Sequence, residues 1–413
     1  MKITKLLIAL AIILTSTLGM TAQYSMTPYS RYGYGILSDN ATSTQRAMGG
    51  VGYAMNSGRQ INVMNPASYA SIDSLTFLFD MGISTSTLWS REGDEQGCTL
   101  GGGLDYITLQ FPMGKYMGAS VGLLPFSSVG YSYGSEIQYG TNAFEGWGGL
   151  NQLYAGVAGK FFNHLSIGAN VSYLFGTTIN DINVQNESGT VKTLFERVMQ
   201  VRDWRVQAGI QYTFNIGANN RFSLGAVYTP YKKLLGKTWG TQYDLNNETE
   251  PTDLGSTSTK EHYSLPDCWG GGISYEWSDR LLVEADFTYQ EWSKAKYSIS
   301  DEIGGSTFDN RWKMAVGAQY TPKPRGNYFE RIQYRLGGFF NHDYLLINGN
   351  NLEEYGVSAG FGLPVNGFET IVNVGFEYRH RQATPKTYIK EDYFNITLGV
   401  NFNEMWFWKN KLR

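Results

Sequence analysis

Apolar and polar residues alternate with a period of two along most of this chain, from about residue 74 to residue 403. In the run 165–175, for example, every odd position is apolar or aromatic and almost every even position is polar or small. Strict alternation over such lengths predicts β-strands with one apolar and one polar face. We count about fourteen such strands and find no convincing helical period among them, so the sequence predicts an all-β fold.

The connections between these strands alternate between short turns and long loops. Short turns are expected at 162–164 and 217–220, and long loops at 134–147, 178–193 and 244–260. This alternation is typical of outer-membrane barrels, in which the turns lie in the periplasm and the loops lie outside. A soluble β-sandwich of this length would need several domains with linkers, and a propeller would need a repeat of roughly 40–50 residues. The sequence shows neither, which favours a transmembrane antiparallel β-barrel of about 14 strands.

Composition agrees with a barrel that has a polar lumen and an apolar outer face. The 413 residues include 49 Gly and 15% aromatic residues, and the mean hydropathy is −0.29. A polytopic helical protein is excluded because it would need repeated apolar runs of roughly 20 residues. The net charge of −3 argues against a nucleic-acid partner. We expect strand-end aromatics such as Trp292, Tyr320 and Tyr378 to form girdles at the membrane surfaces.

The N-terminus has the features of a secretory signal. Lys2 and Lys5 precede an apolar run from Leu6 to Leu18, and Ala22 is a plausible cleavage point. We therefore expect residues 1–22 to be a signal peptide and the mature chain to reside in the outer membrane of a Gram-negative cell.

Residues 23–73 do not alternate and read as turns and short pieces rich in small residues. A segment of about this size ahead of a barrel suits a hatch or plug, because small residues allow close packing against the walls. The expected organisation is a hatch at 23–73, a barrel at 74–403 and a periplasmic tail at 404–413.

Two short motifs in this segment carry a family resemblance. The stretch Ala47–Ala54 (AMGGVGYA) is followed a dozen residues later by Asn65-Pro66-Ala67. Together they resemble the N-terminal signature of FadL-type long-chain fatty-acid transporters. The resemblance implies a fourteen-stranded barrel with an N-terminal hatch. It also implies inward passage of hydrophobic molecules, with lateral exit through a kinked third strand.

The third expected strand contains Pro125, followed by Phe126. Proline cannot donate to a β-ladder, so inside a strand it marks an edge, a bulge or a break. One interpretation is that Pro125 and Phe126 line a lateral opening beside the hatch. The other is a harmless bulge near the outer rim.

No motif in the chain supports catalysis or a bound cofactor. The stretches 118–122 and 356–360 match the hydrolase pattern G-x-S-x-G, but both lie inside alternating strands and lack the strand–turn–helix context that this motif needs. The four His are scattered, and Cys98 and Cys268 have no metal-ligand spacing. We therefore expect no enzyme activity, no cofactor and no metal.

A few charged residues fall on the expected lumen faces, among them Arg335 and Arg379. They could bind the headgroup of an anionic amphiphile, because arginine recognises carboxylate and phosphate groups. Alternatively, they could belong to a polar network that holds the hatch.

The leading hypothesis is passive uptake of a hydrophobic or amphipathic, fatty-acid-like small molecule, with lateral release near the third strand. The residues expected to line this route are Met48, Tyr53, Met55, Met64, Asn65, Pro66, Ala67, Pro125 and Phe126, with Arg335 and Arg379 as headgroup ligands. The acidic loops 91–100 and 244–260 offer no apolar landing site for an acyl chain. The alternative is a non-transporting accessory barrel of a secretion or assembly complex. A continuous apolar tunnel would favour transport, whereas a polar, filled lumen would favour protein partners in the envelope.

Overall fold

The computed structural model describes residues 27–137, 139–188, 192–246, 252–259, 263–297, 308–365 and 370–405. The expected signal peptide at 1–22 and most of the expected tail lie outside the described residues. Of that tail, Glu404 and Met405 belong to the last strand.

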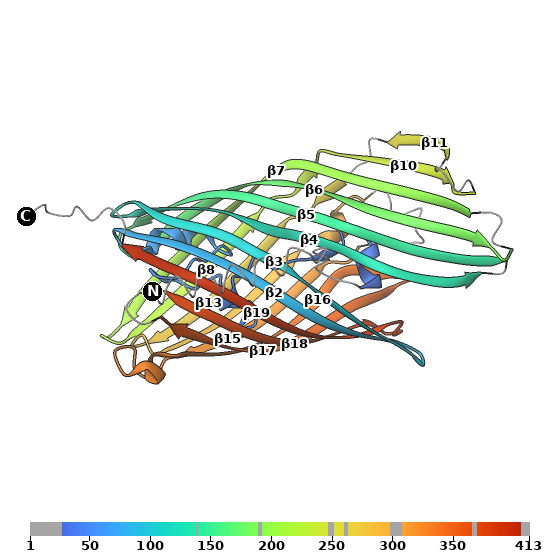
Figure 1. The fold of residues 1–413 in the computed structure, drawn as a ribbon. Coiled ribbons are helices and arrows are strands. Elements are labelled where there is room, and N and C mark those ends of the chain that lie inside the picture. Colours follow the sequence, from blue (N-terminus) through green and yellow to red (C-terminus); the bar gives the residue numbers. More distant parts are fainter. Residues whose placement is uncertain are drawn as a thin grey trace, which may run out of the picture.

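Fourteen antiparallel strands close into a barrel (Figure 1), as the alternation predicts. The barrel strands are β2 (Thr76–Glu92), β3 (Glu95–Gly114), β4 (Met117–Ile137), β5 (Gly140–Phe161), β6 (Leu165–Asn186), β7 (Lys192–Ile216), β8 (Asn220–Thr229), β13 (Cys268–Trp277), β14 (Leu281–Gln290), β15 (Arg311–Tyr320), β16 (Gln333–Ile347), β17 (Asn350–Pro364), β18 (Ile371–Thr384) and β19 (Lys390–Met405). Closure comes from β19 pairing with β2, in a register that runs from Lys390–Arg91 to Met405–Thr76.

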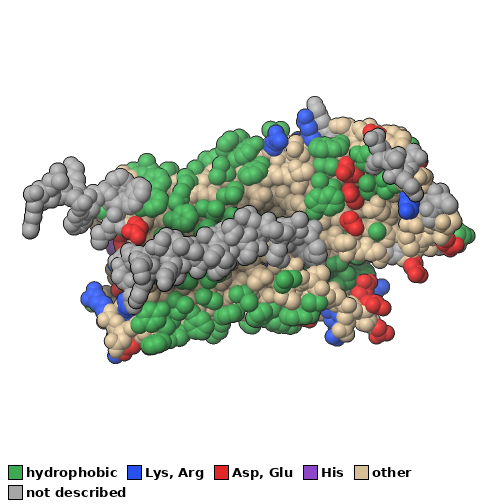
Figure 2. All heavy atoms as spheres, in the orientation of Figure 1, with side chains coloured by type: hydrophobic (Ala, Val, Ile, Leu, Met, Phe, Trp, Pro, Cys, Tyr) green, Lys and Arg blue, Asp and Glu red, His purple; other side chains and the backbone are tan. Residues whose placement is uncertain are grey.

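The two faces of the strands are divided as the sequence predicts. On β6, Ile167 and Val171 are about half exposed, while Ser166 and Asn170 point inward and are buried. The exposed apolar side chains cover much of the surface between the two ends in Figure 2. The outer surface therefore has the apolar belt that a bilayer requires. None of the helices in the described part of the chain is long and apolar enough to span a bilayer.

The wall of the barrel is much taller on one side. Strands β4 to β7 have 21 to 25 residues, whereas β8, β13, β14 and β15 have 10 each. At its far end β7 pairs with β10 (Gly236–Asp244), which in turn pairs with β11 (Thr252–Thr259). Figure 1 shows this tall wall reaching beyond the other strands. We call this end of the barrel the loop end and the opposite one the short-turn end.

The expected long loops at 134–147 and 178–193 were wrong, because most of the described residues in these ranges belong to β4 to β7. Outside a bilayer, the outer face of a strand does not contact lipid. The alternation of apolar and polar residues that marks a membrane strand is therefore weaker in such a region. Residues 220–243 form three separate strands and not one continuous strand. β8 ends at Thr229 before Pro230, and β9 (Lys232–Leu234) then pairs with β12 (Tyr263–Leu265).

The ladder between β3 and β4 is incomplete. These strands pair only from Gly114–Met117 to Ile107–Leu123, although all residues of both strands beyond that point are described. Further along, the edge of β4 is instead paired by β1 (Ile36–Leu37), through Ile36–Ser128 and Leu37–Ser127. We call the unpaired stretch the β3–β4 gap. About seven residues of tilted strand separate it from the short turn, roughly 18 Å along the barrel axis, so the gap begins within the apolar belt.

Candidate functional site in the barrel lumen

Residues 27–73 run inside the barrel and are almost entirely buried. We call them the inner segment; it includes η1 (Pro28–Arg31), β1, α2 (Ser43–Arg46) and η2 (Pro66–Ser71). Its backbone touches the wall where the wall has glycine. A Cβ atom at Gly225 would overlap the Tyr53 carbonyl oxygen, and one at Gly317 would overlap the Met48 carbonyl oxygen. The inward-facing glycines therefore form a cradle that only a bare backbone can provide.

Two carboxylates on β14 hold this segment from the wall. Asp286 accepts hydrogen bonds from the backbone N–H groups of Gly52 (2.6 Å) and Tyr53 (3.0 Å). Glu284 accepts from those of Ala54 (2.8 Å) and Met55 (3.0 Å). Four consecutive backbone donors are thus satisfied by two neighbouring inward positions of one strand. Each of these buried N–H groups would lack a hydrogen-bond acceptor without these side chains, so this contact fixes the segment firmly.

Asp39 marks the middle of the lumen. Its carboxylate forms ion pairs with Lys313 (2.5 Å) and Arg311 (3.3 Å) on β15. Burial alone would raise the pKa of Asp39, but the two cations outweigh it and hold the pKa below its ordinary value. Asp39 and Lys313 line two separate cavities, so this ion pair stands between them.

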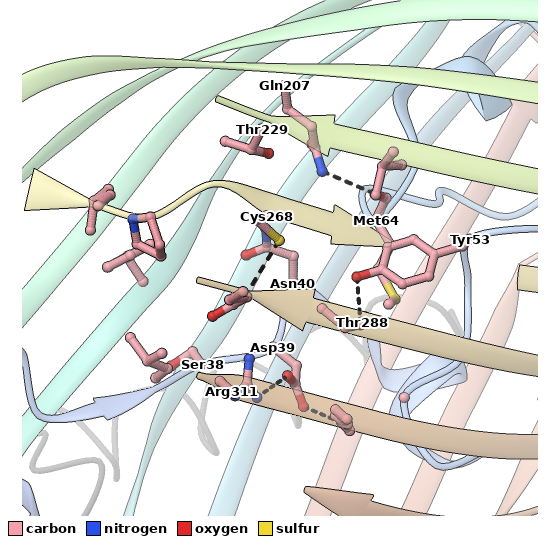
Figure 3. Close-up of a pocket in the computed structure, with 18 of the residues that line it drawn as sticks. Ser38, Asp39, Asn40, Tyr53, Met64, Gln207, Thr229, Cys268, Thr288 and Arg311 are labelled. Carbon is pink, nitrogen blue, oxygen red and sulfur yellow. Dashed lines mark hydrogen bonds and ion pairs between the residues drawn. The ribbon is translucent and has the colours of Figure 1, made fainter. Parts of the chain in front are cut away.

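The first cavity, about 90 Å³, lies between the inner segment and strands β7, β8, β13, β14 and β15 (Figure 3). We call it the Arg205 cavity. Its lining mixes Arg205, Gln207 and Thr229 with apolar side chains such as Phe126 and Leu265. The second cavity, about 130 Å³, is lined by Ser84 and Asp105 beside the β3–β4 gap; we call it the gap cavity. Both are small; the lining of the Arg205 cavity is more apolar than polar, and that of the gap cavity is more polar than apolar.

Towards the loop end the lumen is filled by aromatic rings. Tyr34 of the inner segment is fully buried against Trp292, at 5.6 Å between ring centroids, and Trp292 in turn packs on Tyr344 at 4.4 Å. Tyr297 and Phe308 complete this aromatic cluster. The expectation that Trp292 belongs to an outer girdle was wrong, because it lies in η3 (Trp292–Lys294), which folds inward beyond the end of β14. Tyr320 and Tyr378 are exposed as expected.

The structure separates the residues predicted to line a route. Tyr53, Met64 and Phe126 line the Arg205 cavity. Met48 and Met55 are buried in a small apolar cluster with Val51, Ala315 and Phe339, away from both cavities.

The Asn65-Pro66-Ala67 motif has a local structural role. The Asn65 side chain caps η2 by accepting from the Ala67 N–H (3.0 Å), and it donates to the Tyr53 carbonyl (2.7 Å). Pro66 begins η2 and rests on Gly168 of β6.

Pro125 lies at an irregularity of β4. The pairing of β4 with β5 shifts between Pro125 and Ser127, while its pairing with β3 has already ended at Leu123. The expected kink is therefore present, together with a break in the ladder. Phe126 turns inward and is buried, with the Arg205 guanidinium 5.3 Å from the centroid of its ring.

The two arginines proposed as headgroup ligands are both engaged by the protein. Arg335 donates to Gln319 (2.8 Å) and Asn373 (2.7 Å) and lines neither cavity. Arg379 lines the gap cavity but forms ion pairs with Glu377 (2.7 Å) and Glu354 (3.4 Å). Their contacts fit the alternative interpretation, a polar network within the wall.

Sequence reasoning missed Asp39 and Arg311, which sit at the centre of the charged layer. Arg311 is the first residue of β15, where the alternation begins, and Asp39 lies in a segment without periodicity. Glu284 and Asp286 could be placed on the lumen face by parity, but no sequence signal connects them with residues 52–55.

Cys98 is exposed on β3 and Cys268 is buried on β13, and both are free thiols. Among the described residues, no group of three or more His, Cys, Asp or Glu side chains is arranged to hold a metal ion.

Comparison with known proteins identifies the family. The BamG family model matches residues 2–413. The chain belongs to the BamG family. No curated protein matches its sequence.

Solved structures with the same fold include a Pseudomonas aeruginosa FadL homologue, with 13% identity and a TM-score of 0.61, covering 89% of this chain and 99% of that one. The Pseudomonas putida toluene transporter TodX has 15% identity and a TM-score of 0.59, covering 90% and 99%. The Ralstonia pickettii toluene transporter TbuX has 15% identity and a TM-score of 0.58, covering 88% and 98%. This BamG-family chain therefore shares the barrel fold of FadL-type channels and transporters, as its N-terminal motifs suggest.

Proposed function

We propose that this BamG-family barrel is a closed, non-transporting subunit of an outer-membrane secretion or assembly complex. The observation that carries the proposal is the filled lumen. The inner segment occupies the lumen towards the short-turn end, tied by Glu284 and Asp286, and the aromatic cluster fills it towards the loop end. The cavities between them are about 90 and 130 Å³ and contain ion pairs, so they offer no apolar tunnel.

The tall wall gives such a subunit a surface for a partner. Beyond the shorter strands, the outer face of β5 carries Trp147, which is about 40% exposed. Aromatic side chains of this kind are enriched in protein interfaces. The part of the tall wall that extends beyond the shorter strands does not take part in closing the barrel.

Two measurements on the purified full-length protein test this proposal. In planar bilayers we expect no conductance above the background, because the inner segment and the aromatic cluster leave no open aqueous path through the lumen. In native membranes, a photo-reactive amino acid at Trp147 should crosslink to a protein at the tall wall. The same amino acid at Leu336, which is 66% exposed on the belt of β16, serves as the control and should contact lipid. Stable conductance together with no crosslink at Trp147 would overturn the proposal.

The β3–β4 gap favours a second candidate, the passive uptake of a hydrophobic molecule with lateral release. The gap begins within the apolar belt next to the Pro125 irregularity, and the related folds are described as hydrocarbon or toluene channels and transporters. Uptake would require the inner segment to release β4, because Ile36 and Leu37 now occupy its free edge. Accumulation of toluene or oleate in cells expressing this chain, lost when the gap is crosslinked, would favour uptake over the closed subunit.

A further inference from the structure

Among the described residues, no carboxylate forms an ion pair with Arg205 on β7. Its side chain lines the Arg205 cavity, and its Nε atom is buried without a hydrogen-bond partner. Among the described residues, its one close interaction is the face of the Phe126 ring. A buried charge without a paired group is costly, so proteins seldom retain one that nothing compensates.

The other charges of this cavity do not neutralise Arg205. The cavity is lined by three cations, Arg205, Arg311 and Lys313, but by only two carboxylates, Asp39 and Asp286. Asp39 is shared by Arg311 and Lys313. Asp286 is directed at the backbone of the inner segment. One positive charge is therefore left for an occupant of the cavity.

The other residues that line the cavity indicate which kind of molecule would fit it. Polar groups come from Asn40 and Thr229, and apolar groups from Phe126, Leu265 and Trp292. The volume of about 90 Å³ is too small for a long acyl chain and limits the occupant to a compact body no larger than about one aromatic ring. A guanidinium recognises carboxylates by paired parallel hydrogen bonds.

We propose that the Arg205 cavity binds a small carboxylate with an apolar body, with the carboxylate on Arg205 and the body against Phe126, Leu265 and Trp292. This site goes beyond the proposed function, because a closed barrel can hold such a ligand as well as an open one. It also differs from the headgroup site expected at Arg335 and Arg379, whose guanidinium groups are already engaged by the protein.

The probe is 4-fluorobenzoate, observed by fluorine NMR with the full-length protein in nanodiscs. We expect its signal to broaden with the wild-type protein. Arg205→Gln should weaken binding by about tenfold to a hundredfold, since it removes hydrogen bonds to a charged group. The matched control is Arg202→Gln, on the same strand but on the exposed outer face, which should bind as the wild type does. Neutral 4-fluorobenzamide should not bind.

A second measurement covers the case in which the Arg205 variant folds poorly. Without ligand, Arg205→Gln should unfold at the same or a higher temperature than the wild type, because an uncompensated charge has been removed. Benzoate should raise the unfolding temperature of the wild type only. Absence of broadening with the wild type, or equal broadening with Arg205→Gln, would overturn the site. If equimolar phosphate displaces 4-fluorobenzoate, the site does not require a ligand with an apolar body, and this part of the proposal is wrong.

Discussion

The inner segment is held in two different ways along its length. Towards the short-turn end, around residues 48–68, its backbone lies against wall glycines and donates to wall carboxylates. Towards the loop end, around residues 29–36, its tyrosines insert into a cluster of aromatic rings. The first region depends on close approach and hydrogen-bond direction, and the second depends on side-chain volume. The two regions should therefore fail under different substitutions.

The largest effect is expected from Gly225→Val. Its side chain would overlap the Tyr53 carbonyl group, which is backbone and cannot rotate away. The inner segment should therefore be displaced from the wall, and the free energy of unfolding should fall by about 3 kcal/mol or more. The measurement is the temperature at which the folded band disappears in semi-native gels. The control is Gly271→Val on neighbouring β13, where a Cβ would be 3.9 Å from the nearest other atom. If the two variants are equally stable, close packing of the inner segment against the inward-facing glycines does not stabilise the barrel.

An effect of similar size is expected from Trp292→Ala, which tests the aromatic region. Removing this fully buried ring should cost about 3–5 kcal/mol and leave a void beside Tyr34 and Tyr344. Amide exchange should accelerate at residues 33–36 and remain slow at residues 52–55. Trp277→Ala, on the exposed outer face of β13, is the control and should change neither region. Faster exchange at both ends would show that the two regions are one unit.

A smaller effect is expected from Asp286→Ala. It leaves the buried N–H groups of Gly52 and Tyr53 without acceptors, at a total cost of about 2–4 kcal/mol. Amide exchange should accelerate at these two residues and less at Ala54 and Met55, which Glu284 still holds. Asp286→Asn keeps an acceptor oxygen and should restore most of the protection. If the Asn variant exchanges as fast as the Ala variant, hydrogen-bond acceptance is not the cause.

The smallest effect concerns Asp39, between the two regions. Because its pKa is lowered in the folded state, its contribution to stability is present above the unfolded pKa of about 4 and is lost as the pH falls towards the lower folded value. The wild type should therefore lose more stability than Asp39→Asn between pH 5 and pH 2. Parallel unfolding curves for the two proteins over this range would contradict the role of the Lys313 and Arg311 pairs.

Period-two alternation was sufficient to predict the barrel and most of its strands, because each strand meets lipid on one side and the lumen on the other. It could not predict the tall wall, because apolar and polar residues do not alternate regularly in the sequence at 134–147 and 178–193. Pro125 correctly indicated an irregularity in β4, since the missing N–H is a local property of one residue.

The site was predicted only in part. Tyr53, Met64 and Phe126 do line one cavity, because the inner segment and β4 meet there. The partners of Asp39 lie more than 270 residues away in the chain, and no local pattern encodes such a contact. The same holds for Arg335 and Arg379. The alternation along a strand predicts that an arginine points into the lumen, but it does not predict which carboxylate or amide the arginine contacts.

The start of the inner segment contacts the strand that closes the barrel. The Thr27 hydroxyl donates to Glu391 on β19, and Tyr29 donates to the Ile389 carbonyl just before it. These contacts join residues separated by 360 or more positions, so they form only when the last strand arrives. The seam between β19 and β2 then shuts around a segment that was made first. Packing of the inner segment and closure of the barrel are thus coupled, because each completes hydrogen bonds of the other.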